Sequence, residues 1–264
     1  MEIKLTNITY EEFKKINITI KNEGIIGITG EGNTTLLKII TGMLDNKGSI
    51  TYDKEKITKQ NKIEVSKKIS YISKKFKNDY NKATIEEYMN YMIYYHKLNI
   101  KDPKKKIIDS LKIVDLKENY LERIMSTLST TEKKKFQIAL ALITNPKIIL
   151  IEEPFNDFDA ENRKRILRLL TQLNEKYKIM IIIATTNSDI LYKYTKNIII
   201  IKDYKIFKSG KSKEIFEEVE DLLAEKIEIP DIVKLAYKIK KEKDIHIDYH
   251  RDVRDLMKDI YKHV

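Results

Sequence analysis

The sequence predicts an α/β fold built around a parallel sheet. The first observation is a set of short apolar runs whose length and isoleucine content suit strands buried on both faces. These runs are residues 148–151, 179–184 and 197–201. The second observation is a glycine-rich segment between a predicted strand at 24–29 and a predicted helix at 34–43. The third is residues 80–125, where apolar residues recur at helical spacing and predict a helical insertion.

Two antiparallel strands are predicted ahead of the glycine-rich segment. Residues 2–6 and 16–20 have strand character, and a turn near residues 10–12 separates them. Further strands are predicted at 49–52 and 69–72. We therefore expect a small antiparallel β unit beside the parallel sheet.

The last part of the chain predicts a small helical unit. Three amphipathic patterns follow one another, at residues 215–223, from Pro230 to residue 237, and at residues 253–260. Proline is well placed in the first turn of a helix, where its missing N–H has no intrahelical partner to lose. We expect three helices in this region.

Composition excludes some classes of protein and leaves others open. The chain has no cysteine, which excludes a disulfide framework or a thiol site and fits a reducing compartment. Its net charge is +11, with 45 lysines against 6 arginines. An A+T-rich genome produces such a bias by itself, and the basic residues are scattered along the chain. Attraction to an anionic membrane leaflet is the first alternative, and nucleic-acid binding is a weaker one.

The glycine-rich segment has the spacing of a phosphate-binding loop without its lysine. Such a loop joins a strand to a helix and has the pattern glycine, any four residues, glycine, lysine, and serine or threonine. Its backbone N–H groups bind the phosphates. Gly27, Gly30, Gly32 and Thr34 keep this pattern, but Asn33 occupies the lysine position. We therefore predict a phosphate cradle that lacks its usual cation.

Further motifs follow the phosphate loop at set places along the chain. They are Leu128-Ser129-Thr130-Thr131-Glu132 ahead of a helix, an apolar strand ending in Glu152-Glu153-Pro154, then Asn156-Asp157-Phe158-Asp159, and a strand ending in Ala184-Thr185-Thr186-Asn187. In this order and spacing, the motifs resemble those of the nucleotide-binding subunits of ABC transporters. The resemblance covers about residues 1–212. It implies a RecA-like ABC nucleotide-binding domain over 1–212 with an antiparallel β subdomain and a helical subdomain at about 80–140, followed by a C-terminal helical appendage over 213–264.

The appendage narrows the resemblance to one branch of the family. Its two motifs are Glu214-Ile215-Phe216 and Glu228-Ile229-Pro230-Asp231-Ile232-Val233-Lys234-Leu235-Ala236. This pattern is similar to the C-terminal segment of energy-coupling-factor (ECF) ATPases, which serve importers of vitamins and metal ions. The ATPase subunit of a heterodimeric ABC exporter is the alternative.

The resemblance implies a role for each matching residue. Glu153 is the implied base for the attacking water, Thr186 stands at the switch-histidine position, and Lys74 stands where a glutamine senses Mg²⁺ and water. Thr34 and Glu152 stand at the metal-ligand positions. The implied nucleotide-contact residues are Tyr10, Gly27, Gly30, Glu31, Gly32, Asn33, Thr34, Thr35, Leu128, Ser129, Thr130, Thr131, Glu132 and Asp159. For Tyr10, the alternatives are stacking on adenine and a surface turn.

Five departures from the family pattern fall on its catalytic positions. They are Asn33 for lysine, Lys74 for glutamine, Thr130 and Thr131 for the signature glycines, Glu152 for aspartate, and Thr186 for histidine. Glu31 also adds an acid beside the phosphate site. Because phosphoryl transfer depends on positioning and charge, we expect weak binding of ATP and Mg²⁺ and no turnover by this chain alone. A divergent but active ATPase is the alternative.

The resemblance also implies partners and a location. ABC sites are composite, so we expect a competent ABC ATPase paralogue, a multi-span membrane transport subunit, no nucleic acid, and a peripheral position on the cytoplasmic face of the cell membrane. Glu86 and Glu87 are candidates to meet a basic helix of the membrane subunit, or else are solvated acids at a helix start. A regulatory pseudo-ATPase that binds no nucleotide is one alternative. An ABC protein of ribosomes or DNA is another, but the paired domains or long coiled coils of such proteins are not present.

Overall fold

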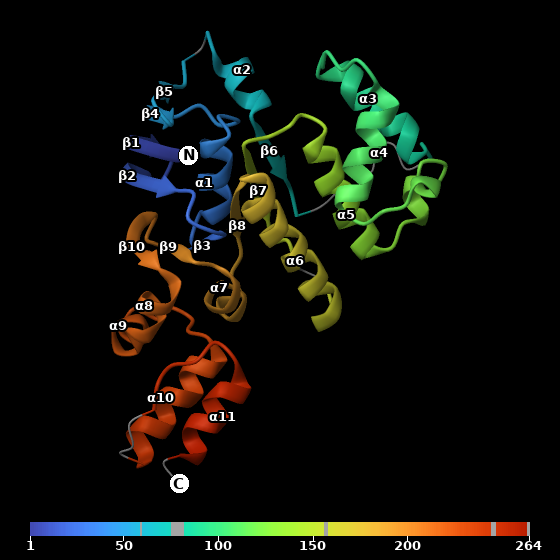
Figure 1. The fold of residues 1–264 in the computed structure, drawn as a ribbon. Coiled ribbons are helices and arrows are strands. Elements are labelled where there is room, and N and C mark those ends of the chain that lie inside the picture. Colours follow the sequence, from blue (N-terminus) through green and yellow to red (C-terminus); the bar gives the residue numbers. More distant parts are fainter. Residues whose placement is uncertain (59, 75–81, 156–157, 244–246, 263–264) are drawn as a thin grey trace.

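The computed structural model describes residues 1–58, 60–74, 82–155, 158–243 and 247–262. Two sheets form in this part of the chain (Figure 1). The smaller is antiparallel, with the strand order β2-β1-β4-β5. Its strands are β1 (Glu2–Tyr10), β2 (Phe13–Lys21), β4 (Lys47–Tyr52) and β5 (Glu55–Lys56). The predicted antiparallel unit is therefore confirmed, with β1 and β2 longer than expected.

The larger sheet has the order β10-β9-β3-β8-β7-β6 and is parallel except where β10 pairs with β9. Its strands are β3 (Ile26–Gly30), β6 (Ile69–Ile72), β7 (Ile148–Glu152), β8 (Met180–Ala184), β9 (Asn197–Lys202) and β10 (Lys205–Lys211). Since parallel strands end at the same edge, the segments that follow β3, β6, β7 and β8 are brought together there. This edge carries the candidate site.

Alternate residues of the central strands enter two different cores. On β7, Ile149 and Ile151 pack in one hydrophobic cluster, whereas Ile148 and Leu150 pack in the other. The first cluster includes residues of α5 (Thr130–Leu142) and α6 (Ala160–Tyr177), and the second includes residues of α1 (Asn33–Ile40) and the antiparallel sheet. Burial on both faces explains why these strands are continuous apolar runs.

The helical region lies beside the β6 edge of the large sheet (Figure 1). It comprises α3 (Ile85–Tyr95) and α4 (Pro103–Ile113), followed by two short 3₁₀ turns, Glu118–Tyr120 and Met125–Thr127, that lead into α5. A short helix, α2 (Lys62–Lys67), precedes β6. The predicted helical insertion is confirmed.

One of the two acids at the start of α3, Glu87, has a structural contact. Glu87 forms a capping box with Thr84, whose N–H donates to the Glu87 carboxylate at 2.8 Å. This contact stabilises the helix start. That Glu86 and Glu87 meet a membrane subunit stays a prediction.

The C-terminal helices leave the core in two stages. Residues of α8 (Ser212–Glu217) and α9 (Val219–Ala224) pack with residues of α7 (Ser188–Tyr194) and β9 in one hydrophobic cluster. The sequence predicted one helix over 215–223, but the backbone of Glu218 (φ −78°, ψ 57°) leaves the helical region and separates α8 from α9.

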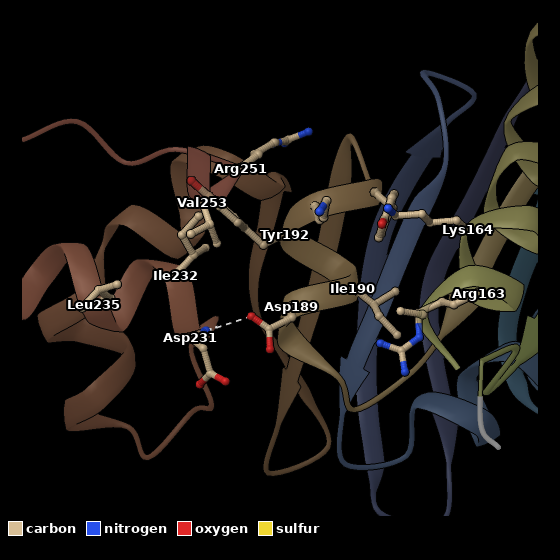
Figure 2. A pocket seen from close by; sticks show the side chains of 13 residues that line it. Arg163, Lys164, Asp189, Ile190, Tyr192, Asp231, Ile232, Leu235, Arg251 and Val253 are labelled. Atoms are coloured by element: carbon tan, nitrogen blue, oxygen red, sulfur yellow. Dashed lines mark hydrogen bonds between the residues drawn. The ribbon is translucent and has the colours of Figure 1, made fainter. Parts of the chain in front are cut away.

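The last two helices form the far end of the molecule (Figure 1). They are α10 (Asp231–Lys243) and α11 (Val253–Tyr261), which share a small buried cluster of Ala236, Ile247 and Leu256. Figure 2 shows where α10 meets α7: the Asp231 N–H donates to Asp189 at 2.8 Å beside a pocket of about 430 Å³. The three predicted C-terminal patterns thus correspond to four helices.

Candidate functional site

The phosphate loop keeps its backbone shape. It runs from β3 into α1, and Gly30 (φ 94°) and Gly32 (φ 74°) both have left-handed backbones that favour glycine. A Cβ atom on Gly30 would lie 1.8 Å from the Ile201 carbonyl oxygen, so a side chain is excluded there. The loop shape is therefore set by glycines and survives without the usual lysine.

Asn33 turns its amide back onto the start of α1. The Thr34 backbone N–H donates to Asn33 Oδ1 at 2.6 Å. N–H groups at a helix start are the donors that bind phosphate in such loops. Asn33 therefore removes the cation and also occupies one of the donors that a phosphate would need.

Glu31 and Thr35 lie on either side of this turn. Glu31 Oε2 accepts a hydrogen bond of 3.0 Å from the Asp203 N–H, which ties the loop to the turn between β9 and β10. Thr35 is partly exposed in the first turn of α1. Direct contact of either residue with a nucleotide stays a prediction.

The Glu152 carboxylate, at the end of β7, is the centre of a hydrogen-bonded cluster. It accepts hydrogen bonds from the Tyr71 hydroxyl (2.9 Å) and the Lys74 backbone N–H (3.3 Å). The single proton of the Thr34 hydroxyl is shared between this carboxylate (3.3 Å) and Asn33 Oδ1 (3.2 Å). Burial, together with the bond to Glu152, raises the pKa of Tyr71, which stays a hydrogen-bond donor. The structure thus brings the predicted metal-ligand pair, Thr34 and Glu152, together with Lys74.

A buried lysine of α5, Lys134, forms no hydrogen bond or ion pair with this cluster in the described part of the chain. Lys134 is 7% exposed, and its ammonium makes no hydrogen bond within the described residues. Burial lowers the pKa of Lys134 to about 8, and the negative charge of Glu152 opposes that shift. Lys134 was not identified from the sequence. The helical spacing of Gln137, Ile138 and Ala141, all on the buried face of α5, could have identified it.

Glu153 points to the neighbouring strand end. Its carboxylate accepts hydrogen bonds from the Thr185 hydroxyl (2.8 Å) and from the Thr186 backbone N–H (3.0 Å). Glu153 also has a positive φ of 39°, a strained value for a residue with a side chain. The implied base and the switch position are therefore adjacent, but the bonds from Thr185 and Thr186 already engage this carboxylate.

The signature segment, residues 128–132, forms hydrogen bonds within itself at the start of α5. Ser129 and Glu132 form a capping box, in which the Ser129 N–H donates to Glu132 at 2.8 Å and the Glu132 N–H donates to Ser129 at 3.3 Å. Glu132 also accepts from Tyr120 (2.5 Å) and Arg123 (2.9 Å).

The other signature residues differ in burial. Leu128 is buried in the core, whereas Thr130 is exposed and Thr131 partly exposed in the first turn of α5. Their contact with a nucleotide stays a prediction.

Asp159 has a structural role at the start of α6. Asp159 caps α6 by accepting the Asn162 N–H at 2.7 Å, which with other hydrogen bonds lowers its pKa. Asn156 and Asp157 lie outside the described residues.

Tyr10 is the last residue of β1 and pairs with Phe13 of β2. The ring that lies against Gly32 is that of Phe13. Whether Tyr10 stacks on a base stays a prediction.

A magnesium ion suits this set of residues poorly. No group of three or more acidic, histidine or cysteine side chains that could hold a metal occurs among the described residues. The remaining oxygen ligands, Thr34 and Glu152, are hydrogen-bonded to each other, and the Tyr71 hydroxyl and the Lys74 N–H also donate to the Glu152 carboxylate. Mg²⁺ binds carboxylate and phosphate oxygens, so it would have to displace these donors to bind Glu152.

The fold and the site together define a class of protein, the ATP-binding cassettes. A family model described as "ABC transporter" matches residues 13–156, more than half of the chain. The chain therefore belongs to the ABC transporter family.

Its relatives include ATP-binding subunits of ECF transporters. The chain is 25% identical over 256 residues to the energy-coupling factor transporter ATP-binding protein EcfA2 of Acetivibrio thermocellus, covering 92% of this chain and 91% of that protein. It is 28% identical over 233 residues to EcfA1 of Ligilactobacillus salivarius, covering 87% and 82%.

Solved structures agree on the fold. The cbiO1 structure from Clostridium perfringens, described as part of the ABC transporter complex cbiONQ, matches with a TM-score of 0.74 and 25% identity. The match covers 88% of this chain and 97% of that one. A dimeric ATP-binding cassette bound to ADP and Pi matches with a TM-score of 0.67 and 23% identity over 80% of this chain and 98% of that one, which supports the fold alone. The predicted fold class and family resemblance are confirmed.

The capping network of Glu132 predicts a pH-dependent contribution to stability. Burial alone would raise the pKa of Glu132, but hydrogen bonds from Tyr120, Ser129 and Arg123 outweigh it and lower the pKa from 4.5 to about 2. Because the folded pKa is depressed, the contribution is complete above pH 4.5 and is lost as the pH falls towards about 2.

We expect Glu132→Gln to lower the free energy of unfolding at pH 7 by about 1 kcal/mol, because glutamine can still close the capping box but loses the negative charge that strengthens the hydrogen bonds from Tyr120 and Arg123. The difference from wild type should shrink in urea titrations at successively lower pH, starting near pH 4.5. Glu122→Gln, at an exposed acid nearby, is the control and should show little effect. A Glu132→Gln deficit that stays constant down to pH 3 would contradict the network.

Proposed function

We propose that this ABC subunit is the catalytically weak half of a heterodimeric ATPase in an ECF-type micronutrient importer. The observation that carries the proposal is the phosphate loop, in which the glycine backbone is kept while Asn33 replaces the cation and accepts the Thr34 N–H. In this proposal the chain binds ATP weakly and couples hydrolysis by its partner to transport. A heterodimeric exporter and a regulatory subunit that binds no nucleotide are the competing proposals.

Charge determines how weak nucleotide binding becomes. Replacing the loop lysine by Asn33 and placing Glu31 nearby changes the local charge by about two units. Each unit is worth on the order of 4 kcal/mol at about 4 Å and an effective dielectric of about 20. Screening by solvent reduces this to about 1 kcal/mol each. Since about 1.4 kcal/mol is a factor of ten, the two changes weaken binding by roughly ten- to a hundredfold.

Turnover is opposed by the contacts of Glu153. A general base must reach the attacking water within hydrogen-bond distance. Here the Glu153 carboxylate is bonded to the Thr185 hydroxyl and the Thr186 N–H, and Thr186 offers no imidazole. Retention of the glutamate alone therefore does not support hydrolysis.

A heterodimer follows from the composite nature of ABC sites. In a dimer of two copies of this chain, both composite sites would be defective. Each would pair a phosphate loop that lacks lysine with a signature segment that lacks glycines. A competent paralogue would supply the lysine, base and histidine of at least one site. The predicted heterodimer agrees with the likeness to ECF ATPases, of which EcfA1 and EcfA2 are named separately.

The membrane subunit has a candidate docking surface on this chain. A groove of about 1000 Å³ runs between the core and the helical region, and its walls include Met43, Tyr71, Tyr88 and Leu140. No helix in the described residues is long and apolar enough to cross a membrane. We propose that a transport subunit in the membrane holds the chain at the cytoplasmic face through this groove, with residues 213–264 as an accessory appendage.

The heterodimer is tested by co-expression with a competent ABC paralogue from the same genome. We expect a stable mixed dimer by light scattering, and ATP hydrolysis that is abolished when the base of the paralogue is changed to glutamine. Glu153→Gln in this chain should leave that hydrolysis within about twofold of wild type, a difference of only about 0.4 kcal/mol. A homodimer of this chain that hydrolyses ATP robustly would refute the proposal.

Restoring charge at the phosphate loop should restore affinity. We expect Asn33→Lys with Glu31→Ser to tighten ATP binding at least about tenfold in calorimetric titration, by the same charge argument. Asn90→Lys with Glu86→Ser makes the same charge change on α3 and should leave the affinity unchanged. Equal affinities for wild type and the loop variant would show that the charge argument is wrong.

A further inference from the structure

A pocket of about 430 Å³ lies between the nucleotide-binding core and the C-terminal appendage (Figure 2). One wall belongs to α6 and α7, and the other belongs to α10 and to the segment that leads into α11. The hydrogen bond from the Asp231 N–H to Asp189 joins the two walls. Small-molecule sites have volumes of roughly 300–1000 Å³, so this pocket is large enough to hold a ligand.

Two of the six arginines of the chain line this pocket, and both are held in place. Arg251 donates to the Ser212 hydroxyl at 2.9 Å, and its guanidinium lies 5.6 Å from the centre of the Tyr192 ring. Arg163 donates to the Phe158 carbonyl at 3.3 Å. A guanidinium has five N–H donors in a fixed plane, a geometry that suits carboxylate and phosphate oxygens. The contacts with the protein use only some of these donors.

The pocket has an excess of positive charge. Lys164 and Lys193 add to the two arginines, so four cationic side chains line it together with two acidic ones, Asp189 and Asp231. None of the four cations forms an ion pair within the described residues, whereas Asp231 pairs with Lys234 at 3.1 Å. The charge of the pocket therefore favours an anion.

The appendage supplies an apolar wall. Ile232 and Leu235 of α10 and Val253 of α11 line the pocket, and Figure 2 shows them on the side opposite Arg163 and Lys164. Leu235 is 43% exposed and Val253 is 58% exposed, so this wall is in contact with water. Covering it with an apolar group is favourable.

We propose that this pocket binds a small amphipathic anion, namely a carboxylate or a phosphate ester with an apolar body. The charged oxygens bind among the cations of α6 and α7, and the apolar body covers the wall formed by α10 and α11. The ligand then joins the core to the appendage, because it contacts both. The inference does not depend on the proposed function, since none of the candidate nucleotide-site residues lines this pocket.

The test is calorimetric titration of the full chain with octanoate and with monooctyl phosphate, which share one apolar body. We expect at least one of them to bind at a single site, and the comparison identifies the preferred charged group. Acetate and inorganic phosphate lack the apolar body, and octylammonium has the opposite charge. All three should bind at least about tenfold more weakly. Failure of both octyl anions to bind, or equal binding of octylammonium, would overturn the inference.

A pair of arginine variants tests whether the anion binds in this pocket. Arg163→Gln with Arg251→Gln should weaken binding at least about tenfold, because charge-assisted hydrogen bonds are lost. Arg165→Gln with Arg168→Gln removes the same charge from exposed positions of α6 outside the pocket, and should behave as wild type. Equal weakening by the two pairs would show that the general charge of the chain attracts the anion, and would overturn the inference.

A variant of the apolar wall keeps the test decisive if the loss of Arg251 loosens the appendage. Leu235→Ser changes an exposed side chain and should weaken binding by about fivefold through lost apolar contact. Leu223→Ser, at a similarly exposed position of α9 outside the pocket, is the control and should bind as wild type. Equal binding by the two variants would contradict the inference.

The melting temperature gives a second readout, because a ligand that binds only the folded chain stabilises it. The octyl anion should raise the melting temperature of Leu223→Ser more than that of Leu235→Ser. If instead neither anion binds, and Leu235→Ser changes the oligomeric state in light scattering, the apolar wall is a contact between protein chains and the inference is wrong.

Discussion

The contacts of the Glu152 carboxylate connect the elements on which the candidate site depends. Glu152 ends the central strand β7, and it binds the start of α1 through Thr34 and the end of β6 through Tyr71 and Lys74. If this carboxylate turned away, the start of α1 would lose its hydrogen bond to β7, and the segment from Tyr71 to Lys74 would lose two more.

This chain keeps the backbone shape of an ATP-binding cassette, although side chains at the positions that carry its chemistry are changed. The shape of the phosphate loop comes from backbone: Gly30 approaches the Ile201 carbonyl, and Gly32 lies under the Phe13 ring. Neither contact involves the missing lysine, so the loop can form without it. The chemistry comes from side chains, and at those positions this chain forms hydrogen bonds within itself, as Asn33 does with the Thr34 N–H.

Sequence patterns predicted the parts of the fold that burial controls. The β7 and β8 strands are continuous apolar runs because both faces are covered, and the structure confirms them. The edge strand β10 was missed because it is rich in lysine and largely exposed, which is how edge strands resist further pairing. The break between α8 and α9 was missed because it depends on the backbone of Glu218 and not on apolar spacing.

The candidate site was predictable in position but not in its contacts. Motif order identified Thr34, Glu152, Glu153 and Thr186 at or just after the ends of predicted strands, and the structure brings the ends of β3, β7 and β8 to one edge of the sheet. The direction of the Asn33 amide could not be read from the sequence, because side-chain rotamers depend on neighbours that the fold supplies. The burial of Lys134 was not predicted for a different reason. Lys134 lies in a run of three lysines, which is typical of a solvated helix face.

Whether this chain keeps the shape of an ATP-binding cassette but satisfies the groups of its site by hydrogen bonds within itself is tested most directly by anomalous diffraction. Crystals grown with ATP and MnCl₂ would be measured at the manganese absorption edge. We expect no anomalous peak between the Thr34 hydroxyl and the Glu152 carboxylate, with Asn33 still accepting the Thr34 N–H and Tyr71 still donating to Glu152. A manganese peak at that position, with the Tyr71 hydroxyl displaced from Glu152, would contradict this expectation.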